Sequence, residues 1–331
     1  MPSKAAAGTA VVVAAAMLLA LPHFLSFSQR EVLVFLTINV LVVCSYRLLT
    51  LTGEWSLGHV VMMGVGAYAS AILAKRFGVH VPVAMLLGAG IAVVVALALS
   101  FPLFRMKGFY FLIGSFAAGE IIRLLWKRFR DPFGGPKGIK RIDPMPDIDF
   151  GFWQFTAFDP VSYYYFVLVV VTASLVVMWR IENSRIGLTF HAVHWQDSLA
   201  QASGISVRAY RTLALVIASG FAGLAGALLA HYIGTVNPNM FDIEQMVYVL
   251  TWAIVGGTAT FYGPIIGCIA LTVVNEIVLR ELGLEQGRPL VYGLLLIGTV
   301  LFLPKGLEDA VARTWKLAAG LWSGRQVGGG R

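Results

Sequence analysis

The chain has 331 residues, of which 58% are hydrophobic and 13% charged, and its formal net charge is +8. Soluble domains carry about 45–50% apolar and about 25% charged residues, so this composition predicts a multi-pass helical membrane protein. An excess of Lys and Arg is typical of cytoplasmic loops in such proteins, and does not call for nucleic acid as a partner. Cys44 and Cys268 both lie inside apolar runs, which argues against a disulfide scaffold and against a thiolate metal site.

Ten apolar segments approach the length of roughly 20 residues that a helix needs to cross the hydrocarbon core. They cover residues 8–27, 32–50, 56–74, 82–104, 109–126, 161–180, 211–233, 246–257, 262–280 and 289–303. The first resembles a signal peptide, but no small-x-small cleavage site follows, so we interpret it as an uncleaved span. We therefore predict an all-α, polytopic membrane protein with about ten (8–10) transmembrane or re-entrant helices, the short eighth and tenth being candidates for re-entrant or broken ones. Residues 1–303 are expected to form a single transmembrane domain.

The distribution of Lys and Arg predicts the orientation. Basic residues after Pro304 place the C-terminus in the cytoplasm, and counting back places the N-terminus there too. The segment 181–210 then faces the cytoplasm and the loop 127–160 faces out. That loop conflicts with the rule, since it holds six Lys and Arg residues against five Asp residues. Residues 304–331 are expected to form a cytoplasmic amphipathic tail at the membrane surface.

Sequence motifs for catalysis are scarce. The chain has no G-x-x-x-x-G-K-[ST], no H-E-x-x-H and no G-x-S-x-G. His191 and His194 are three residues apart but lack a third ligand, so no metal site is predicted. We expect a protein that is not an enzyme and that binds no cofactor itself.

Polar residues inside the predicted spans are costly and therefore point to function or to ion pairing. The stretch "GEWSLGHVVMMGVGAY" places Glu54, Ser56 and His59 near the cytoplasmic end of the third span. In the fifth span, Glu120 precedes Arg123 by three residues, a spacing at which the two charges can neutralise each other. For each, a pathway or gate and a structural pair are both open interpretations.

Two later spans carry comparable features. In "RTLALVIASGFAGLAGALLAHYI", small residues recur every fourth position, Gly223 and Gly226 among them, and let a partner helix approach closely. A moving interface or static packing would each explain this pattern. The ninth span ends in "NEIVLR", which contains Asn275 and Glu276 as further polar candidates.

The polar segment "SRIGLTFHAVHWQDSLAQASGISVRAYR", residues 184–211, separates two spans. Its pattern predicts a helical stretch that breaks at Gly204-Ile205 and restarts into the seventh span. A short helix would then lie across the cytoplasmic mouth, where it could either dock on a soluble partner or rest on the membrane surface.

At this point the motifs resemble those of the LivM-type permeases of branched-chain amino acid ABC importers, a family that also includes urea and short-amide permeases. The similarity covers residues 45–307. Five stretches carry it in order: "GEWSLGHVVMMGVGAY", "KGFYFLIGSFAAGEIIR", "FGGPKGI", "AIVGGTATFYGPIIG" and "YGLLLIGTVLFLPKGL". The chain departs from the family pattern at Glu54, Trp55, Ser115 and Thr258, where Gln, Leu, Thr and Gly are usual.

The resemblance implies a permease subunit that translocates small hydrophobic amino acids. Its partners would be two cytoplasmic ATPase subunits that bind ATP and Mg, a second and usually unlike permease, an external binding protein and membrane lipid. Segment 181–210 would be the coupling loop that docks on an ATPase through Asp197, Ala200, Gly204, Ile205 and His194. Residues Gly134, Gly135, Gly138 and Ile139 of "FGGPKGI" would dock the binding protein. The implied pathway or gate residues are Ser56, His59, Ser115, Glu120, Gly223, Gly226, Asn275 and Glu276.

Alternatives remain at this stage. A urea, short-amide or organic-carboxylate permease of the same family would share every motif. A passive channel would need no coupling helix and no ATP. A membrane enzyme would need a convergent His/Asp/Glu or Ser/Lys set, which the sequence does not display.

Overall fold

The computed structural model describes residues 16–149, 154–155, 159–275, 287–302 and 306–309. Most of these residues are helical: residues 16–24, then α2 (Phe27–Thr50), α3 (His59–Phe77), α4 (Val81–Leu103), α5 (Phe109–Arg128), α6 (Pro160–Glu182), α7 (Arg185–Trp195), α8 (Asp197–Ala202), α9 (Val207–Ile233), α10 (Ile243–Gly256), α11 (Gly263–Val273) and α12 (Arg288–Phe302). Short strands β1 (Ile139–Lys140), β2 (Ile148–Asp149), β3 (Gln154–Phe155) and β4 (Thr235–Val236) complete the described chain. The all-α membrane fold is confirmed.

The described residues contain fewer long apolar helices than the number of spans predicted from the sequence. In the described part of the chain, six helices are long and apolar enough to cross a membrane: α2, α3, α4, α5, α6 and α9. About ten spans are therefore not confirmed. Helix α10 has 14 residues, or about 21 Å, which is shorter than the roughly 30 Å hydrocarbon core. Residues 8–15 of the predicted first span and most of the tail 304–331 lie outside the described residues.

Several helix starts are set by side chains that accept hydrogen bonds from free backbone amides. Asp159 does so at α6, Ser184 at α7 and Asp242 at α10. At the other end, Gly78 and Gly234 adopt left-handed conformations that terminate α3 and α9. These local signals fix where each helix begins or ends independently of its apolar length.

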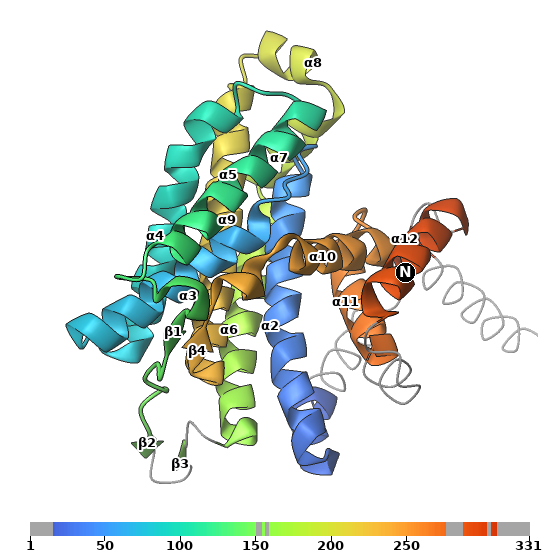
Figure 1. Cartoon of the computed structure of the whole chain (residues 1–331). Helices are drawn as coiled ribbons and strands as arrows, with labels where there is room; N and C mark the ends of the chain where they lie inside the picture. The colour runs from blue at the N-terminus through green and yellow to red at the C-terminus, as the bar shows by residue number, and fades with distance from the viewer. Residues whose placement is uncertain (1–15, 150–153, 156–158, 276–286, 303–305, 310–331) are drawn as a thin grey trace, which may run out of the picture.

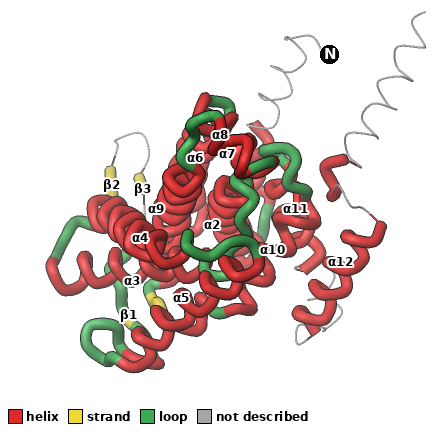
Figure 2. The backbone as a smooth tube through the Cα atoms, turned by 90° about the horizontal axis from the view of Figure 1, so that it is seen from above, coloured by secondary structure: helices red, strands yellow, loops and turns green. Residues whose placement is uncertain are grey.

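Helix α9 is the centre of the bundle and packs against α2, α3 and α4. Figure 1 shows α2, α6 and α9 with roughly aligned axes, with α7 and α8 at one end of the bundle and the β-strands at the other. We call these the α8 end and the β1 end. In the view along the bundle, α10, α11 and α12 lie to one side, and α12 is the outermost of them (Figure 2).

Glycines allow the central helices to touch through their backbones. A Cβ atom at Gly66 of α3 would collide with the backbone of Gly223 in α9, and one at Gly226 would collide with Met63. Ala92 of α4 packs against Gly223 in the same layer. Since apolar side chains gain little by leaving lipid for a protein interface, this close contact is what holds the helices together.

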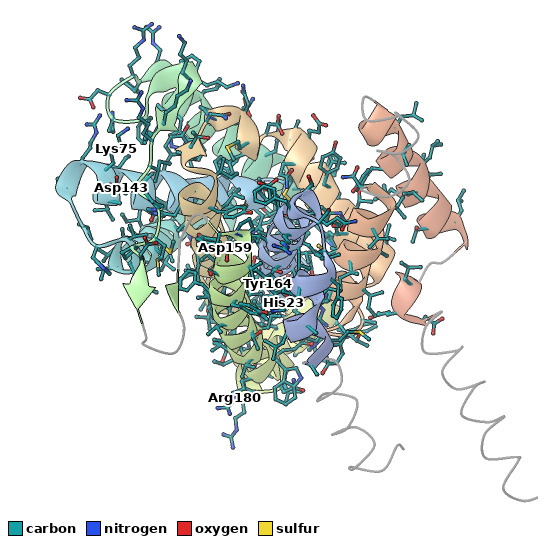
Figure 3. All side chains as sticks on the ribbon, turned by 90° about the horizontal axis from the view of Figure 1, so that it is seen from below. His23, Lys75, Asp143, Asp159, Tyr164 and Arg180 are labelled. Atoms are coloured by element: carbon teal, nitrogen blue, oxygen red, sulfur yellow. The ribbon has the colours of Figure 1, made fainter. Side chains whose placement is uncertain are left out.

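Two further contacts secure the ends of the chain. Tyr164 donates a hydrogen bond to the carbonyl of Leu18 and Tyr165 contacts His23 at 2.9 Å, so residues 16–24 lie against α6 (Figure 3). Glu308 accepts hydrogen bonds from the amides of Ala259 and Thr260, which ties the segment 306–309 to the turn between α10 and α11.

The β1 end is closed by short backbone pairings. Strand β1 pairs antiparallel with β4, with Ile139 opposite Val236, and β2 pairs with β3. Because β4 follows α9 directly, the loop after α5 is joined to the end of the central helix.

Replacement of Gly66 by valine should disrupt the α3–α9 contact, because the added carbons have no space between the two backbones. We expect the free energy of unfolding to fall by at least the about 1–3 kcal/mol typical of overpacking. The measurement is the thermal midpoint and the folded yield in detergent. Gly90→Val is the matched control, since nothing lies within 4 Å of a Cβ there. Equal losses for both variants would contradict the packing argument.

Candidate functional site

The loop between α2 and α3, residues 51–58, is the first component of the site at the α8 end. It is not helical, yet Thr52, Glu54 and Ser56 are all buried. The predicted third span, 56–74, therefore begins too early, because α3 starts only at His59. Gly53 adopts a left-handed conformation, with φ of 81°, which the sharp turn of this loop requires.

Arg211 connects this loop to the short helices at the α8 end. Its Nε lies 3.1 Å from Oε1 of Glu54, and its Nη2 donates a 3.0 Å hydrogen bond to Asp197. Glu54 is only 2% exposed, so removing its positive partner would leave a carboxylate without compensation in a region of low dielectric. One arginine on α9 thus joins α8 to the loop that leads into α3.

Burial raises the pKa of the Glu54 carboxyl above its ordinary value of 4.5, Arg211 opposes the increase and nearby Asp197 adds to it. Oε2 of Glu54 has no hydrogen-bond partner among the described residues. The contact with Arg211 is therefore a charge interaction rather than an aligned, two-bond pair.

Helices α7 and α8 fold back onto the chain instead of projecting freely. Ala200 packs with Val193 and Val207 in a small buried cluster, against which Ile205 is partly buried. His194 Nδ1 lies 3.2 Å from the carbonyl of Thr50, at the end of α2. The predicted coupling residues His194, Asp197, Ala200 and Ile205 are therefore brought together by the fold.

Gly204 supplies the break between α8 and α9. The Ile205 amide donates to the carbonyl of Ala200 and the Gly204 amide donates to Gln201, while Gly204 has φ of 81°. This is a helix ending that favours glycine at the left-handed position. The helical stretch, the break and the restart predicted from the sequence are all present.

A second buried charge contact lies nearby, and sequence analysis did not identify it. Arg47 of α2 forms an ion pair with Glu182 at the end of α6, and its Nη2 also donates to the carbonyl of Thr258. Arg47 is 1% exposed. The sequence signal for this contact was an arginine inside an otherwise apolar run. Its partners could not be identified from the sequence, because they are more than 100 residues away.

Ser56, His59 and Ser115, which were predicted to lie near a pathway, line one small cavity between α3, α4 and α5. Its volume is about 20 Å³, enough for about one water molecule. The Ser115 hydroxyl accepts a hydrogen bond from the Leu57 amide and donates one to Leu112. The cavity is thus closed to substrate-sized molecules in this conformation.

One of the two ring nitrogens of His59, Nε2, has a hydrogen-bond partner. The Ser45 hydroxyl donates to the carbonyl of Val42, so it accepts from His59 Nε2 at 2.9 Å. Nδ1 is then the unprotonated nitrogen, and it is buried with no hydrogen-bond partner in the described residues.

The remaining predicted pathway residues are dispersed. Glu120 and Arg123 form the expected pair, with Arg123 Nε 2.8 Å from Oε2 of Glu120. Gly223 and Gly226 serve the contact of α9 with α3 and α4, and line none of the cavities described here. Asn275 has a buried Oδ1 without a partner in the described chain, and Glu276 lies outside the described residues.

The predicted docking glycines form a tight turn at the β1 end. Gly134, Gly135 and Gly138 all have positive φ, and a Cβ at Gly138 would collide with Val236 and Asn237. Ile139 is buried in the β1–β4 pairing. These residues shape the loop, and any docking role would belong to the surface that they support.

No cluster of three or more His, Cys, Asp or Glu residues suited to a metal ion occurs among the described residues. Six helices long and apolar enough to span a membrane, with a polar segment packed on one end of the bundle, define a multi-pass membrane protein. The sequence profile described as "Branched-chain amino acid transport system / permease component" matches residues 29–303, and the chain belongs to this family.

Individual relatives agree with the family profile. The chain is 28% identical over 296 residues to the "High-affinity branched-chain amino acid transport system permease protein LivM" of Escherichia coli strain K12, a match that spans 84% of this chain and 69% of that protein. It is 25% identical over 266 residues to "Probable branched-chain amino acid transport permease protein LivH" of Methanocaldococcus jannaschii, covering 76% and 81%. No solved structure matches. The chain is therefore an ABC transporter permease of the LivM type.

The variant Arg211→Met should destabilise the α8 end, because it leaves Glu54 buried and charged. We expect the free energy of unfolding to fall by an amount toward the lower end of the about 3–5 kcal/mol that is typical when a buried ion pair loses one partner. Glu54→Gln should be close to neutral, and the double variant should recover part of the loss. A thermal unfolding cycle of the four proteins in detergent measures the coupling. Additive losses would contradict the interaction.

The pH dependence of stability follows from the raised pKa of Glu54. Since the folded state binds this proton more tightly than the unfolded state, the Glu54 contribution to stability is largest below 4.5 and falls as pH rises through the folded pKa. The difference in thermal midpoint between wild type and Glu54→Gln should therefore decrease from pH 4.5 upward. If this difference in thermal midpoint instead grows with pH, the folded protein stabilises the charged form of Glu54 over the neutral form, and the prediction is wrong.

Proposed function

We propose that this chain is the membrane-spanning subunit of an ATP-driven importer that translocates small hydrophobic, branched-chain amino acids. The observation that supports it most directly is the polar α7–α8 segment, which packs on the end of the bundle and is linked by Arg211 to the α2–α3 loop. A partner that moved α8 would move this loop, because separating the charges would leave the Glu54 carboxylate buried without a positive partner.

The surface of this segment suits docking of a soluble protein. Trp195 is 83% exposed and Leu199 62% exposed, although neither lies in a helix long enough to span the membrane. Exposed aromatic and aliphatic side chains of this kind are typical anchors of protein interfaces. We propose that α7 and α8 seat on one of two cytoplasmic ATPase subunits, which bind the ATP and Mg that this chain does not.

Just before Asp197, where the family resemblance implies arginines and acidic residues, this chain has Phe190, His191, His194, Trp195 and Gln196. Phe190 is buried and packs edge-on against Tyr210, so it supports the fold of the segment. His194 contacts the end of α2. Trp195 is the member of this group best placed to select a particular ATPase.

The proposed transporter also contains a second permease and an external binding protein. The relatives named LivM and LivH are separate permease proteins, which favours a second, unlike permease beside this one. An external binding protein would deliver substrate at the β1 end, near the turn that Gly134 and Gly138 form. The bacterial inner membrane, with both termini in the cytoplasm, is the corresponding location.

The substrate class is inferred from the names of the relatives, each of which refers to branched-chain amino acid transport. A urea, short-amide or organic-carboxylate substrate is the second candidate, since Glu54 and Ser115 depart from the family pattern. In either case ATP can drive transport only if it favours one conformation over the other.

The test is ATP-dependent uptake in proteoliposomes that contain this chain with its candidate permease, ATPases and binding protein. Leucine, phenylalanine, urea and benzoate are supplied separately. We expect leucine to accumulate only with ATP. Accumulation of urea or benzoate instead would change the substrate class, and equilibration without ATP would indicate a channel.

Two arginine substitutions test the coupling role. Gly204→Arg should reduce uptake at least tenfold, because it strains the turn after α8 and places a bulky cation on the docking surface. Gly78→Arg is the matched control, since both glycines have positive φ and open space around the Cβ position. Trp195→Ala, which introduces no strain, should also lower uptake and weaken ATPase binding. Normal uptake in both α8-end variants would contradict the proposal.

A further inference from the structure

An apolar groove lies between α3, α4 and α5, toward the β1 end. Its volume is about 550 Å³, within the roughly 300–1,000 Å³ range of small-molecule sites. Its walls are almost entirely apolar, and include Ile72, Leu73, Ile91, Leu125 and Phe133. Because all three helices are membrane-spanning candidates, the groove lies within the depth of the membrane.

A basic pocket of about 300 Å³ lies at the end of this groove. Ile72 and Pro132 line both spaces, so the two are adjacent. Four cations also line the pocket, and no carboxylate does: Lys75, Arg76, Arg130 and Lys140.

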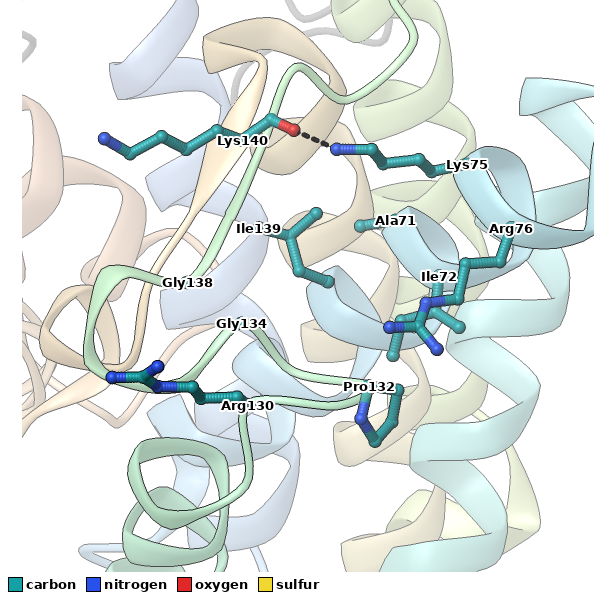
Figure 4. Close-up of a pocket in the computed structure, with 10 residues that line it drawn as sticks. All are labelled: Ala71, Ile72, Lys75, Arg76, Arg130, Pro132, Gly134, Gly138, Ile139 and Lys140. Atoms are coloured by element: carbon teal, nitrogen blue, oxygen red, sulfur yellow. Dashed lines mark hydrogen bonds between the residues drawn. The ribbon is translucent and has the colours of Figure 1, made fainter.

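The arrangement of the cations indicates where an anion would bind. Figure 4 shows Lys75 and Arg76 extending from the last turn of α3 toward the loop, while the side chains of Arg130 and Lys140 extend away from α3. Lys75 donates to the carbonyl of Lys140, and Arg76 pairs with the exposed Asp131 at the edge of the pocket. The four cations and this one carboxylate leave a net positive charge at the mouth of the groove.

The surroundings favour a lipid. Phe77 and Phe129 line the groove and are 71% and 51% exposed, as expected for aromatic residues at a membrane interface. Tyr68, which also lines the groove, has a buried hydroxyl with no partner among the described residues, and an ester carbonyl would be a suitable acceptor. A free phosphate would use only the pocket, and an apolar helix would use only the groove.

We propose that the groove and the pocket together bind one anionic phospholipid, with an acyl chain in the groove and the phosphate at Lys75 and Arg76. The same site gives a role to two of the basic residues in the 127–160 loop, Arg130 and Lys140, which line the pocket. Basic side chains at a membrane surface attract anionic headgroups, and a bound lipid would support the α3–α5 contact around the small Ser56–Ser115 cavity.

The experiment is lipid binding to the purified full-length chain, followed by native mass spectrometry in detergent. Phosphatidylglycerol and phosphatidylcholine with identical acyl chains are titrated in parallel. We expect phosphatidylglycerol to bind at least about tenfold more tightly. Inorganic phosphate at the same concentration should not compete, and competition by it would overturn the lipid assignment.

Variants separate the two halves of the site. Lys75→Gln/Arg76→Gln should abolish the preference for phosphatidylglycerol, whereas Arg180→Gln/Arg185→Gln, which removes two exposed cations at the opposite end, should retain it. Ala69→Phe should fill the groove and reduce binding of both lipids, whereas Val169→Phe on the exposed face of α6 should not. Unchanged binding in the first double variant would overturn the proposal.

A cross-linking measurement in the assembled transporter distinguishes a bound lipid from a second permease subunit as the occupant of the groove. The variant Ala69→Cys is reacted in the membrane with a photoactivatable phosphatidylglycerol and, in parallel, with a bifunctional protein cross-linker. Labelling by the lipid is expected. Cross-linking to a second permease without lipid labelling would make the groove a subunit interface. Thermal midpoints in phosphatidylcholine nanodiscs verify that each variant is folded.

Discussion

Backbone contact between α3 and α9 is the constraint from which the rest of the structure follows. Gly66, Gly223 and Gly226 bring the two helices closer than any side chain would allow, and Ala92 of α4 completes the layer. In a membrane this contact replaces the hydrophobic drive that organises a soluble core. It also determines where the ends of the helices lie, so the loops that connect them meet in fixed positions at the α8 end and the β1 end.

Charges at the α8 end depend on this geometry. Arg47 and Arg211 are largely buried, and each reaches a carboxylate from a segment distant in sequence: Glu182 in the first case, Glu54 and Asp197 in the second. Such pairs contribute little net stability when intact, but separating them is costly. They therefore define one arrangement of the α2–α3 loop, α6 and α8 rather than simply adding to the stability of the bundle.

Local signals in the sequence were sufficient for much of the fold. The apolar runs placed α4, α6 and α9 to within a few residues, Gly204 marked the break after α8, and the spacing of Glu120 and Arg123 predicted their pairing. The buried loop 51–58 could not be predicted, because its burial depends on Arg211 and on the Ser115 hydroxyl, both remote in sequence. The short eighth apolar segment, 246–257, corresponds to α10, whose 14 residues are too few for a full crossing, as its length had indicated.

Helix α9 links the two ends of the bundle mechanically. Its 27 residues make a rod about 40 Å long, with no internal proline. Near its first turn Arg211 holds Asp197, and near its last turn His231 contacts Ser70 and the carbonyl of Asp143, just before β4 pairs with β1. Because these contacts join one rigid helix to both ends of the bundle, a tilt of α9 at the α8 end would also displace the loop at the β1 end.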